Sequence, residues 1–290
     1  NWYQKHNALH FPLEKVPLSE VSSEAIIRRD INQKMISRWQ NGSFFHLNYT
    51  GGTKAMAVHV YNRLKELMDN GQYQFSYLDA NNYRLVLDNY GVIEEDLRRS
   101  IQMEFADLID LHGFKRKNTH RDEIDLEKAV KAYQRYISDP KVNSMNEQDG
   151  KPFEIYLQKK LNDNFSKKLN SKHGVLYNWE IQKHGWRTHF ELDLILLNGY
   201  HLTGVSCTVS YKKESCKAKG FEVILRTRQI GGDEARAILI TRSNRNQTQL
   251  LQEELVYETG GSHDNILVLG IDDLKNESLY LRKIKKFVFD

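Results

Sequence analysis

Residues 48–56 read Asn-Tyr-Thr-Gly-Gly-Thr-Lys-Ala-Met, and this stretch decides how the first part of the chain is interpreted. An apolar run, Phe44–Leu47, precedes it, and an amphipathic run that begins at Lys54 follows it. This order predicts a strand, a glycine turn and a helix. The two glycines let a ligand approach the backbone, and a helix start offers unpaired N–H groups and the positive end of the helix dipole. The turn therefore suits phosphate or ribose groups.

The glycine spacing excludes two common phosphate-binding motifs. It matches neither the GxxxxGK[ST] of a Walker A loop nor the GxGxxG of a dinucleotide-binding fold. An alternative that needs no ligand is a tight strand-to-helix turn in which Thr53 is the N-cap. The turn taken alone leaves both interpretations open.

The longer pattern N-x-T-G-G-T-K-x-M resembles the ligand motif of CARF domains, the Rossmann-like sensors of cyclic oligoadenylates in type III CRISPR immunity. In that family the motif lines a pocket at a dimer interface. The resemblance therefore implies a homodimer that binds a cyclic oligoadenylate, and it favours cyclic tetra-adenylate. The residues that match, and that we expect to bind the ligand, are Asn48, Thr50, Gly51, Gly52, Thr53, Lys54 and Met56.

Composition indicates a globular protein. The chain has 290 residues, 40% hydrophobic and 28% charged, which is enough for two domains with cores. No apolar run approaches the roughly 20 residues that span a bilayer, and we find no signal-peptide pattern, so we expect no membrane partner. Cys207 and Cys216 form no disulfide framework or zinc spacing, and we expect a cytoplasmic location. The net charge of +4 permits a nucleic-acid partner.

Residues 1–90 are expected to form the CARF domain. The patterns predict a helix from Ser22 to about Trp39, a strand at Phe44–Tyr49, a helix at Lys54–Asp69 and a hairpin over Tyr73–Leu87. The expected apolar stripe of the second helix is Ala55, Val58, Tyr61, Leu64 and Leu67. This is too small for a whole doubly wound sheet. Because the chain also lacks an initial Met, we expect the first one or two βα units of the domain to be absent.

Residues 91–145 are expected to be a helical connector, with helices at Asp96–Leu111 and Leu126–Ile137. Residues 146–290 are expected to be an α/β domain with a mixed sheet. Its expected elements are helices at Phe153–Leu169, Lys217–Ile230, Gln247–Leu255 and Leu279–Val288, and strands at Val175–Gln182, His189–Leu197, Tyr200–Val209, Ala237–Thr241 and Ile266–Leu269.

Acidic residues on one of these strands suggest a metal site. Strand periodicity places Glu191 and Asp193 on one face, with Leu192, Leu194 and Leu196 on the other. Buried acids are costly unless they are paired or bound to a metal, and carboxylates suit Mg²⁺ or Mn²⁺. We expect Asp193 to be the first metal ligand, and Glu154 on the preceding helix to be the second. Such an ion can activate water against a phosphodiester.

This arrangement resembles the PD-(D/E)xK nucleases, and one branch closely: the CRISPR ancillary nucleases that carry a CARF domain. Their nuclease half commonly reads E-x-D, a glycine turn, a strand ending in SCK, a helix with a Glu, and GGD-x-A. The corresponding residues here are Glu191-Leu-Asp193, Asn198-Gly199, Ser206-Cys207-Thr208, Glu222 and Gly231-Gly-Asp-Glu-Ala235. The resemblance implies a restriction-endonuclease-like domain, and a catalytic role for Glu222 beside Asp193 and Glu154.

The chain departs from the branch at the lysine of the SCK motif, which is Thr208 here. That lysine normally orients water and stabilises negative charge. We expect a replacement from the following helix, with Lys217 and Lys219 as equal candidates. The alternative is a weak or inactive nuclease half.

Each acid also has a structural alternative. Asp193 could pair with Arg187 or His189, Glu154 could be an exposed helix residue, and Glu222 could form only a surface ion pair with Lys219.

The leading hypothesis is a metal-dependent nuclease of type III CRISPR defence that a cyclic oligoadenylate activates and that cleaves DNA or RNA. Two alternatives remain. One is a CARF sensor whose second domain grips nucleic acid without cutting it, and the other is a ring nuclease that degrades its own activator.

Overall fold

The computed structural model describes residues 14–38, 44–67, 72–80, 82–88, 91–92, 96–117, 125–138, 145, 147–169 and 174–290. The chain divides into two compact units, unit 1 (Asn1–Ser100) and unit 2 (Ile101–Asp290). Residues of the expected connector, 91–145, fall in both units. Parts of the expected helix ends at 39 and 68–69 lie outside the described residues.

Unit 1 contains a four-stranded sheet in the order β1-β2-β3-β4, with β1 at Phe45–Asn48, β2 at Tyr73–Asp79, β3 at Arg84–Leu87 and β4 at Gly91–Val92. β1 is parallel to β2, and the other pairs are antiparallel. The expected strand, glycine turn, helix and hairpin are therefore confirmed. The short strand β4 was not expected.

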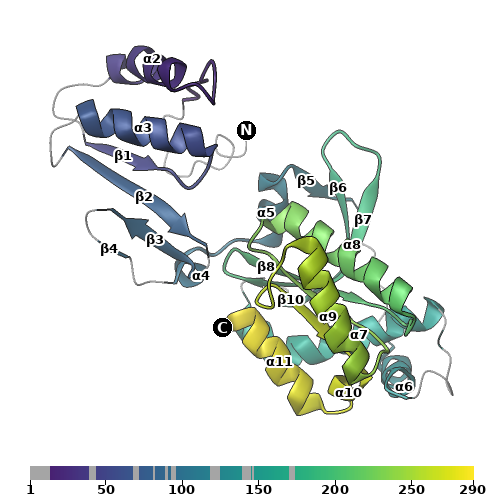
Figure 1. The fold of residues 1–290 in the computed structure, drawn as a ribbon. Helices are drawn as coiled ribbons and strands as arrows, with labels where there is room; N and C mark the ends of the chain where they lie inside the picture. The colour runs from purple at the N-terminus through teal and green to yellow at the C-terminus, as the bar shows by residue number, and fades with distance from the viewer. Residues whose placement is uncertain are drawn as a thin grey trace. The chain divides into compact units, whose positions relative to one another are not determined.

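Two helices, α2 (Glu24–Lys34) and α3 (Lys54–Leu67), lie side by side on one face of this sheet (Figure 1). A 3-10 turn, Ile36–Arg38, follows α2. The unit 1 core consists of buried side chains from both helices and from β2, namely Ile27, Ile31, Leu64, Tyr73 and Phe75. The predicted apolar face of α3 was wrong at one position. Val58 is 52% exposed, and Val60 contacts the core instead.

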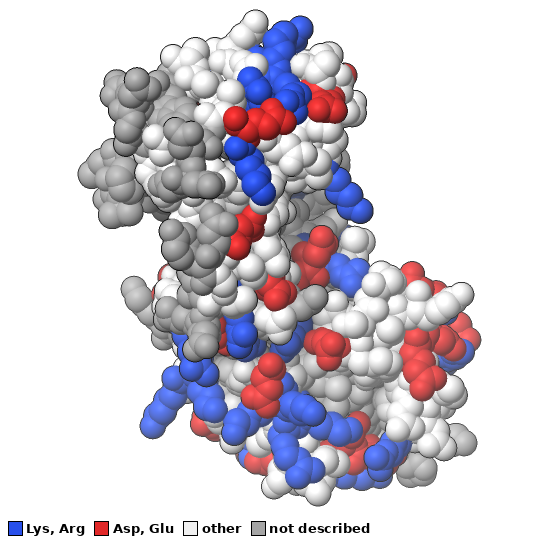
Figure 2. Space-filling model, turned by 60° about the vertical axis from the view of Figure 1, so that its left-hand side comes forward, with Lys and Arg blue, Asp and Glu red and all other residues white. Residues whose placement is uncertain are grey.

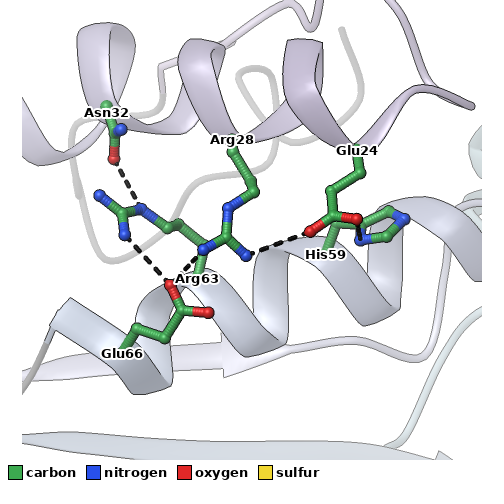
Figure 3. A network of polar contacts seen from close by, with 6 residues as sticks. All are labelled: Glu24, Arg28, Asn32, His59, Arg63 and Glu66. Carbon is green, nitrogen blue, oxygen red and sulfur yellow. Dashed lines mark hydrogen bonds and ion pairs between the residues drawn. The ribbon is translucent and has the colours of Figure 1, made fainter.

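A polar network joins the exposed sides of α2 and α3 (Figure 3). Arg28 of α2 forms ion pairs with Glu24, at 3.4 Å, and with Glu66 of α3. Arg63 approaches Glu66 at 3.1 Å and donates from Nε to Asn32 at 2.9 Å. The network lies above the small apolar core, and because its members are partly exposed each pair contributes little alone.

Unit 2 contains a mixed six-stranded sheet in the order β10-β9-β8-β7-β6-β5. The strands are β5 (Phe114–Arg116), β6 (Leu176–Lys183), β7 (His189–Asn198), β8 (His201–Cys207), β9 (Arg236–Ile240) and β10 (Ile266–Leu269). The β8–β9 and β9–β10 pairs are parallel, and the others are antiparallel. The mixed α/β architecture expected for this half of the chain is therefore confirmed.

Helices cover both faces of this sheet (Figure 1). One core contains residues of α5 (Phe105–Leu111), α8 (Lys213–Gly231) and α9 (Arg245–Thr259). The other contains residues of α6 (Leu126–Tyr136), α7 (Glu147–Phe165), α10 (Ile271–Leu274) and α11 (Glu277–Phe289). A 3-10 turn at Ser166–Lys168 follows α7. α8 lies very close to β8, since a Cβ at Gly204 would be 2.3 Å from Oγ1 of Thr227.

The expected helix at Asp96–Leu111 was wrong. The structure has α4 (Leu97–Ser100) and α5, separated by the non-helical residues 101–104. A hydrogen bond from Met103 N to Gly199 O, at 3.4 Å, ties this break to the β7–β8 turn. Tertiary contact therefore overrides the helical periodicity of the segment.

α6 is part of unit 2 rather than of a connector. The buried Arg242, which follows β9, donates from Nε to the carbonyl of Tyr136 at 3.1 Å. Tyr136 stacks on Phe153 with ring centroids 3.6 Å apart, and its hydroxyl donates to the carbonyl of Thr208 at 2.7 Å. These contacts fix the end of α6 against the ends of β8 and β9.

Within the part of the chain that the structure describes, every helix is too short or too polar to cross a membrane.

Candidate functional site

The glycine loop comprises residues 48–56, between β1 and α3, and its polar side chains form hydrogen bonds within unit 1. Asn48 donates to the hydroxyl of the buried Ser76 at 3.1 Å, and its Oδ1 accepts from Thr50 N at 3.1 Å. Oγ1 of Thr50 accepts from Leu78 N at 2.7 Å, which ties the loop to β2. Thr53 caps α3, since its Oγ1 accepts from Met56 N at 3.2 Å. The N-cap of the alternative interpretation is present. The ligand-binding role of the loop stays a prediction.

The loop also presents groups suited to a ligand. Gly52 has φ of +90°, which favours glycine, and a Cβ on Gly51 would meet nothing within 4 Å. Lys54 is exposed at the first position of α3, where the helix dipole is positive. The Met56 side chain lies beside Gly52, at 3.6 Å from where a Cβ would be. A negatively charged ligand could therefore meet the backbone of the loop and one ammonium group.

The second candidate site lies where β7 and β8 separate in unit 2. The β7–β8 pairing extends from Asn198↔His201 to Leu194↔Val205 and stops before Asp193. Oδ2 of Asp193 bridges the gap, because it accepts from Cys207 N at 2.6 Å and from Ser206 Oγ at 3.0 Å. These partners replace the expected alternatives, Arg187 and His189.

The expected strict alternation along β7 was wrong. Leu192 packs in the α8 core, whereas Leu194 and Leu196 pack in the α7 core. The β6–β7 pairing is interrupted between Trp179↔Leu192 and Tyr177↔Leu194, where Asn178 has φ of +52°. Asp193 therefore lies opposite this left-handed residue, at the interruption of the pairing.

The charges of three carboxylates influence one another, and we call Glu154, Glu191 and Asp193 the acid cluster. Glu154, on α7, is only 9% exposed, so the alternative of an exposed helix residue is excluded. Burial, with further contributions from the charges of Asp193 and Glu191, raises the pKa of Glu154 to about 8. Burial also raises the pKa of Glu191 and of Asp193. The cluster therefore holds negative charge that its surroundings do not fully compensate.

Of the two candidate lysines, the structure brings Lys219 to the cluster. Burial opposes the charge of Lys219, but its hydrogen bond to Glu222, at 2.9 Å, and the charges of Glu222, Asp193 and Glu154 raise its pKa overall. Lys217 instead binds acids of α9, with Nζ 2.6 Å from Glu258 and 3.4 Å from Glu254.

Thr208, at the position of the missing lysine, has a structural role. Its Oγ1 accepts from Ser210 N at 3.2 Å, and its backbone N donates to Ile240 O at 2.9 Å. The residue therefore stabilises the turn that leads from β8 toward α8.

The donor set suits a hard divalent ion with few protein ligands. No three His, Cys, Asp or Glu side chains of the described residues converge closely enough to hold a metal ion. Asp193 and Glu154 would supply two carboxylates, and Mg²⁺ or Mn²⁺ commonly fills its remaining positions with water and substrate oxygens. Burial disfavours the charge of these two carboxylates, and a cation bound there would offset that charge.

Sequence reasoning missed the groups that hold these sites in place. Ser76 anchors Asn48 and also lies 2.8 Å from Nε2 of His46. The Cys207 N–H holds Asp193. Ser76 is at a polar position of the alternation in β2, so the pattern does not reveal its burial. No side-chain pattern marks a backbone donor.

Comparisons with known proteins place the fold. No family model matches the chain, and no curated protein matches it. Protein VC1899 from Vibrio cholerae is similar, with a TM-score of 0.67, 12% identity and coverage of 92% of this chain and 82% of that one. Can2 from Sulfobacillus thermosulfidooxidans, solved with cyclic tetra-adenylate, has a TM-score of 0.65, 16% identity and coverage of 93% and 83%.

A third similar structure is a type III CRISPR defence DNA nuclease activated by cyclic oligoadenylate. Its TM-score is 0.50 at 20% identity, with coverage of 78% of this chain and 36% of that one. At these identities the similarity shows the fold. The two-unit α/β fold expected from the CARF nuclease resemblance is therefore confirmed.

Proposed function

We propose that the chain, which shares the fold of Can2, is a metal-dependent nuclease of CRISPR defence that a cyclic oligoadenylate activates. The observation that carries this proposal is the acid cluster facing Lys219 at the separation of β7 and β8. Burial raises the pKa of all three carboxylates of the cluster, and perturbed acids of this kind are common at catalytic sites.

The residues divide the work as follows. Asp193, held by Ser206 and Cys207, and Glu154, in its ionised form, bind the ion. The bound Mg²⁺ or Mn²⁺ supplies charge neutralisation and an activated water for phosphodiester hydrolysis. Lys219 places an ammonium group near the reacting phosphate and stabilises the negative charge that develops there. Glu222 orients Lys219 through their hydrogen bond.

The glycine loop is the proposed activator site. Its backbone and Lys54 bind cyclic tetra-adenylate across the two-fold axis of a homodimer. Activation requires that the ligand bind more tightly to the cleavage-competent arrangement than to the resting one. Figure 2 shows Lys and Arg side chains interspersed with acidic ones on the face drawn.

The test is cleavage of labelled single-stranded DNA, single-stranded RNA and plasmid with Mn²⁺, with and without cyclic tetra-adenylate, and with EDTA. We expect cutting only when metal and activator are both present. Cutting that persists in EDTA would contradict the metal-dependent site.

A second candidate is a sensor that binds nucleic acid without cutting it, and Thr208 favours it because the motif lysine is replaced. It predicts activator-dependent binding of nucleic acid with no cleavage under any metal condition.

A further inference from the structure

A cavity of about 400 Å³ opens beside the turn of the β6–β7 hairpin, near α8. We name it the hairpin pocket, and the lining residues that matter here are Lys183, Trp186, His189, Phe190, Arg226 and Gln229. The hairpin projects beyond the other strands of the sheet (Figure 1). The nine residues that line the pocket include no carboxylate, so its charge is positive and its walls are partly aromatic.

Trp186 is the most unusual of these residues, because it is 61% exposed on an ordered turn. The backbone N–H of Trp186 donates to the carbonyl of Lys183 at 3.1 Å, and the backbone carbonyl of Trp186 accepts from the side-chain Nε2 of Gln182 at 2.7 Å. Gly185 has φ of +80° within the turn. The backbone thus holds a large aromatic ring at the pocket with much of its surface open to a ligand.

Cationic groups flank the aromatic ones. Lys183 Nζ lies 5.6 Å from the centroid of the Trp186 ring, and the Arg226 guanidinium lies 4.7 Å from that of Phe190. Arg226 NH1 donates to Gln229 at 3.1 Å, whereas its buried Nε has no hydrogen-bond partner in the described part of the chain. An aromatic surface beside guanidinium and ammonium groups matches the two parts of a nucleotide, the base and the phosphate.

The pocket is linked to the acid cluster by α8. Arg226 follows Lys219 by seven residues, and this spacing returns to the same helix face about 10 Å farther along the axis. A strand bound near Lys219 can therefore extend along α8 to the pocket.

From these observations we infer that the hairpin pocket is a substrate subsite, in which an unpaired base stacks on Trp186 and its phosphate contacts Arg226. The inference rests on the proposed function in that the bound strand is the one that the acid cluster would cleave. Stacking is indifferent to base identity, so the subsite favours single-stranded segments over fully paired duplex without reading their sequence.

The test measures binding by fluorescence anisotropy in EDTA, where cleavage is blocked, with labelled oligothymidylate and oligouridylate. It uses the full chain with and without cyclic tetra-adenylate. We expect Trp186→Ala to weaken binding about 5- to 100-fold and Trp186→Phe to retain most of the affinity. The matched control is Tyr257→Ala on α9, since Tyr257 is 88% exposed and lies outside the pocket. Arg226→Gln should lower the slope of log affinity against log salt concentration by about one.

An oligonucleotide with an abasic analogue at every position has no base to stack on Trp186. Trp186→Ala should therefore leave the affinity for this oligonucleotide unchanged, whereas a variant that fails to fold would lose affinity for both oligonucleotides. Equal affinity of Trp186→Ala and Tyr257→Ala for oligothymidylate would overturn the subsite, and so would absence of binding by the unaltered chain. Cleavage is measured separately with Mn²⁺. Binding that depends on Trp186 without any cleavage would support the subsite and contradict the nuclease.

Discussion

In the glycine loop of unit 1, Asn48, Thr50 and Thr53 each form hydrogen bonds within the chain, whereas in unit 2 the carboxylates of the acid cluster repel one another. The loop is thus held in shape before any ligand arrives, and what it leaves for a ligand is backbone and Lys54. The acid cluster keeps an unfavourable charge distribution in a rigid sheet. Motif residues of the glycine loop therefore maintain a backbone conformation, whereas those of the acid cluster are placed for catalysis under the proposed function. Substitutions of the hydrogen-bonded loop residues should change stability, and substitutions in the acid cluster should change activity.

Asp193→Asn should have the largest effect on activity. The amide oxygen can still accept from Cys207 and Ser206, so the fold should persist, but the ionic metal ligand is lost. We expect cleavage to fall by at least about 100-fold, with unchanged binding of cyclic tetra-adenylate by calorimetry. Asp264→Asn, at an exposed position in unit 2, is the matched control. Full cleavage by Asp193→Asn would remove the acid cluster from the mechanism.

Lys219→Ala and Lys217→Ala form a matched pair on one helix. Lys219 faces the acid cluster, whereas Lys217 binds Glu258 and Glu254. We expect the first change to lower kcat about 10- to 100-fold and the second to leave it within about 2-fold. If Lys217→Ala caused the larger loss, the assignment of the two lysines would be reversed.

Glu154 should make stability depend on pH in the absence of metal. Its pKa of about 8 in the folded chain exceeds the ordinary value of 4.5, so the folded state holds an extra proton between these pH values. The free energy of unfolding should therefore fall as pH rises through this window. Relative to the unaltered chain, Glu154→Gln should gain up to about 5 kcal/mol at pH above 8 and little near pH 4.5, because each unit of pKa change corresponds to about 1.4 kcal/mol.

Denaturant titrations in EDTA at several pH values would measure this difference. A gap between the two chains that does not change with pH would show that Glu154 is not the titrating group.

The smallest effect should come from the glycine loop and should appear in stability as well as in binding. Thr50→Val removes the acceptor of Leu78 N and should cost about 1 kcal/mol in the unfolding of unit 1. Lys54→Ala, at an exposed position, should weaken binding of cyclic tetra-adenylate without changing the melting temperature. Equal melting temperatures for both variants would contradict the structural role of Thr50.

The sequence predicted those parts of the fold in which local pattern and tertiary packing agree. The strand at Ile266–Leu269 and the parallel βα unit around the glycine loop are examples. It failed at Asp96–Leu111, where the apolar spacing fits a helix but a contact to the β7–β8 turn interrupts it. It also failed on β7, where the pairing with β6 is interrupted at Asn178, whose left-handed conformation period two does not predict.

For the candidate site, the sequence was a better guide to which acidic residues lie there than to which lysine does. The motif order brought Asp193, Glu154 and Glu222 together from distant segments. Lys217 and Lys219 could not be separated from sequence, because both lie on α8 and only the position of α9 diverts Lys217 to Glu254 and Glu258. The hairpin pocket has no motif at all, since an exposed tryptophan in a turn is visible only in three dimensions.

The close approach of Gly204 to Thr227 has a consequence for the products of the reaction. With no room for a Cβ between β8 and α8, the helix packs directly on the strand. Lys219 and Arg226 both lie on this helix, so the distance between their positions is set by the helical rise. Under the two proposals, the base held in the hairpin pocket and the phosphate that is cut are then separated by a fixed number of nucleotides. A single base moved step by step along an otherwise abasic strand would move the cleavage position by equal steps.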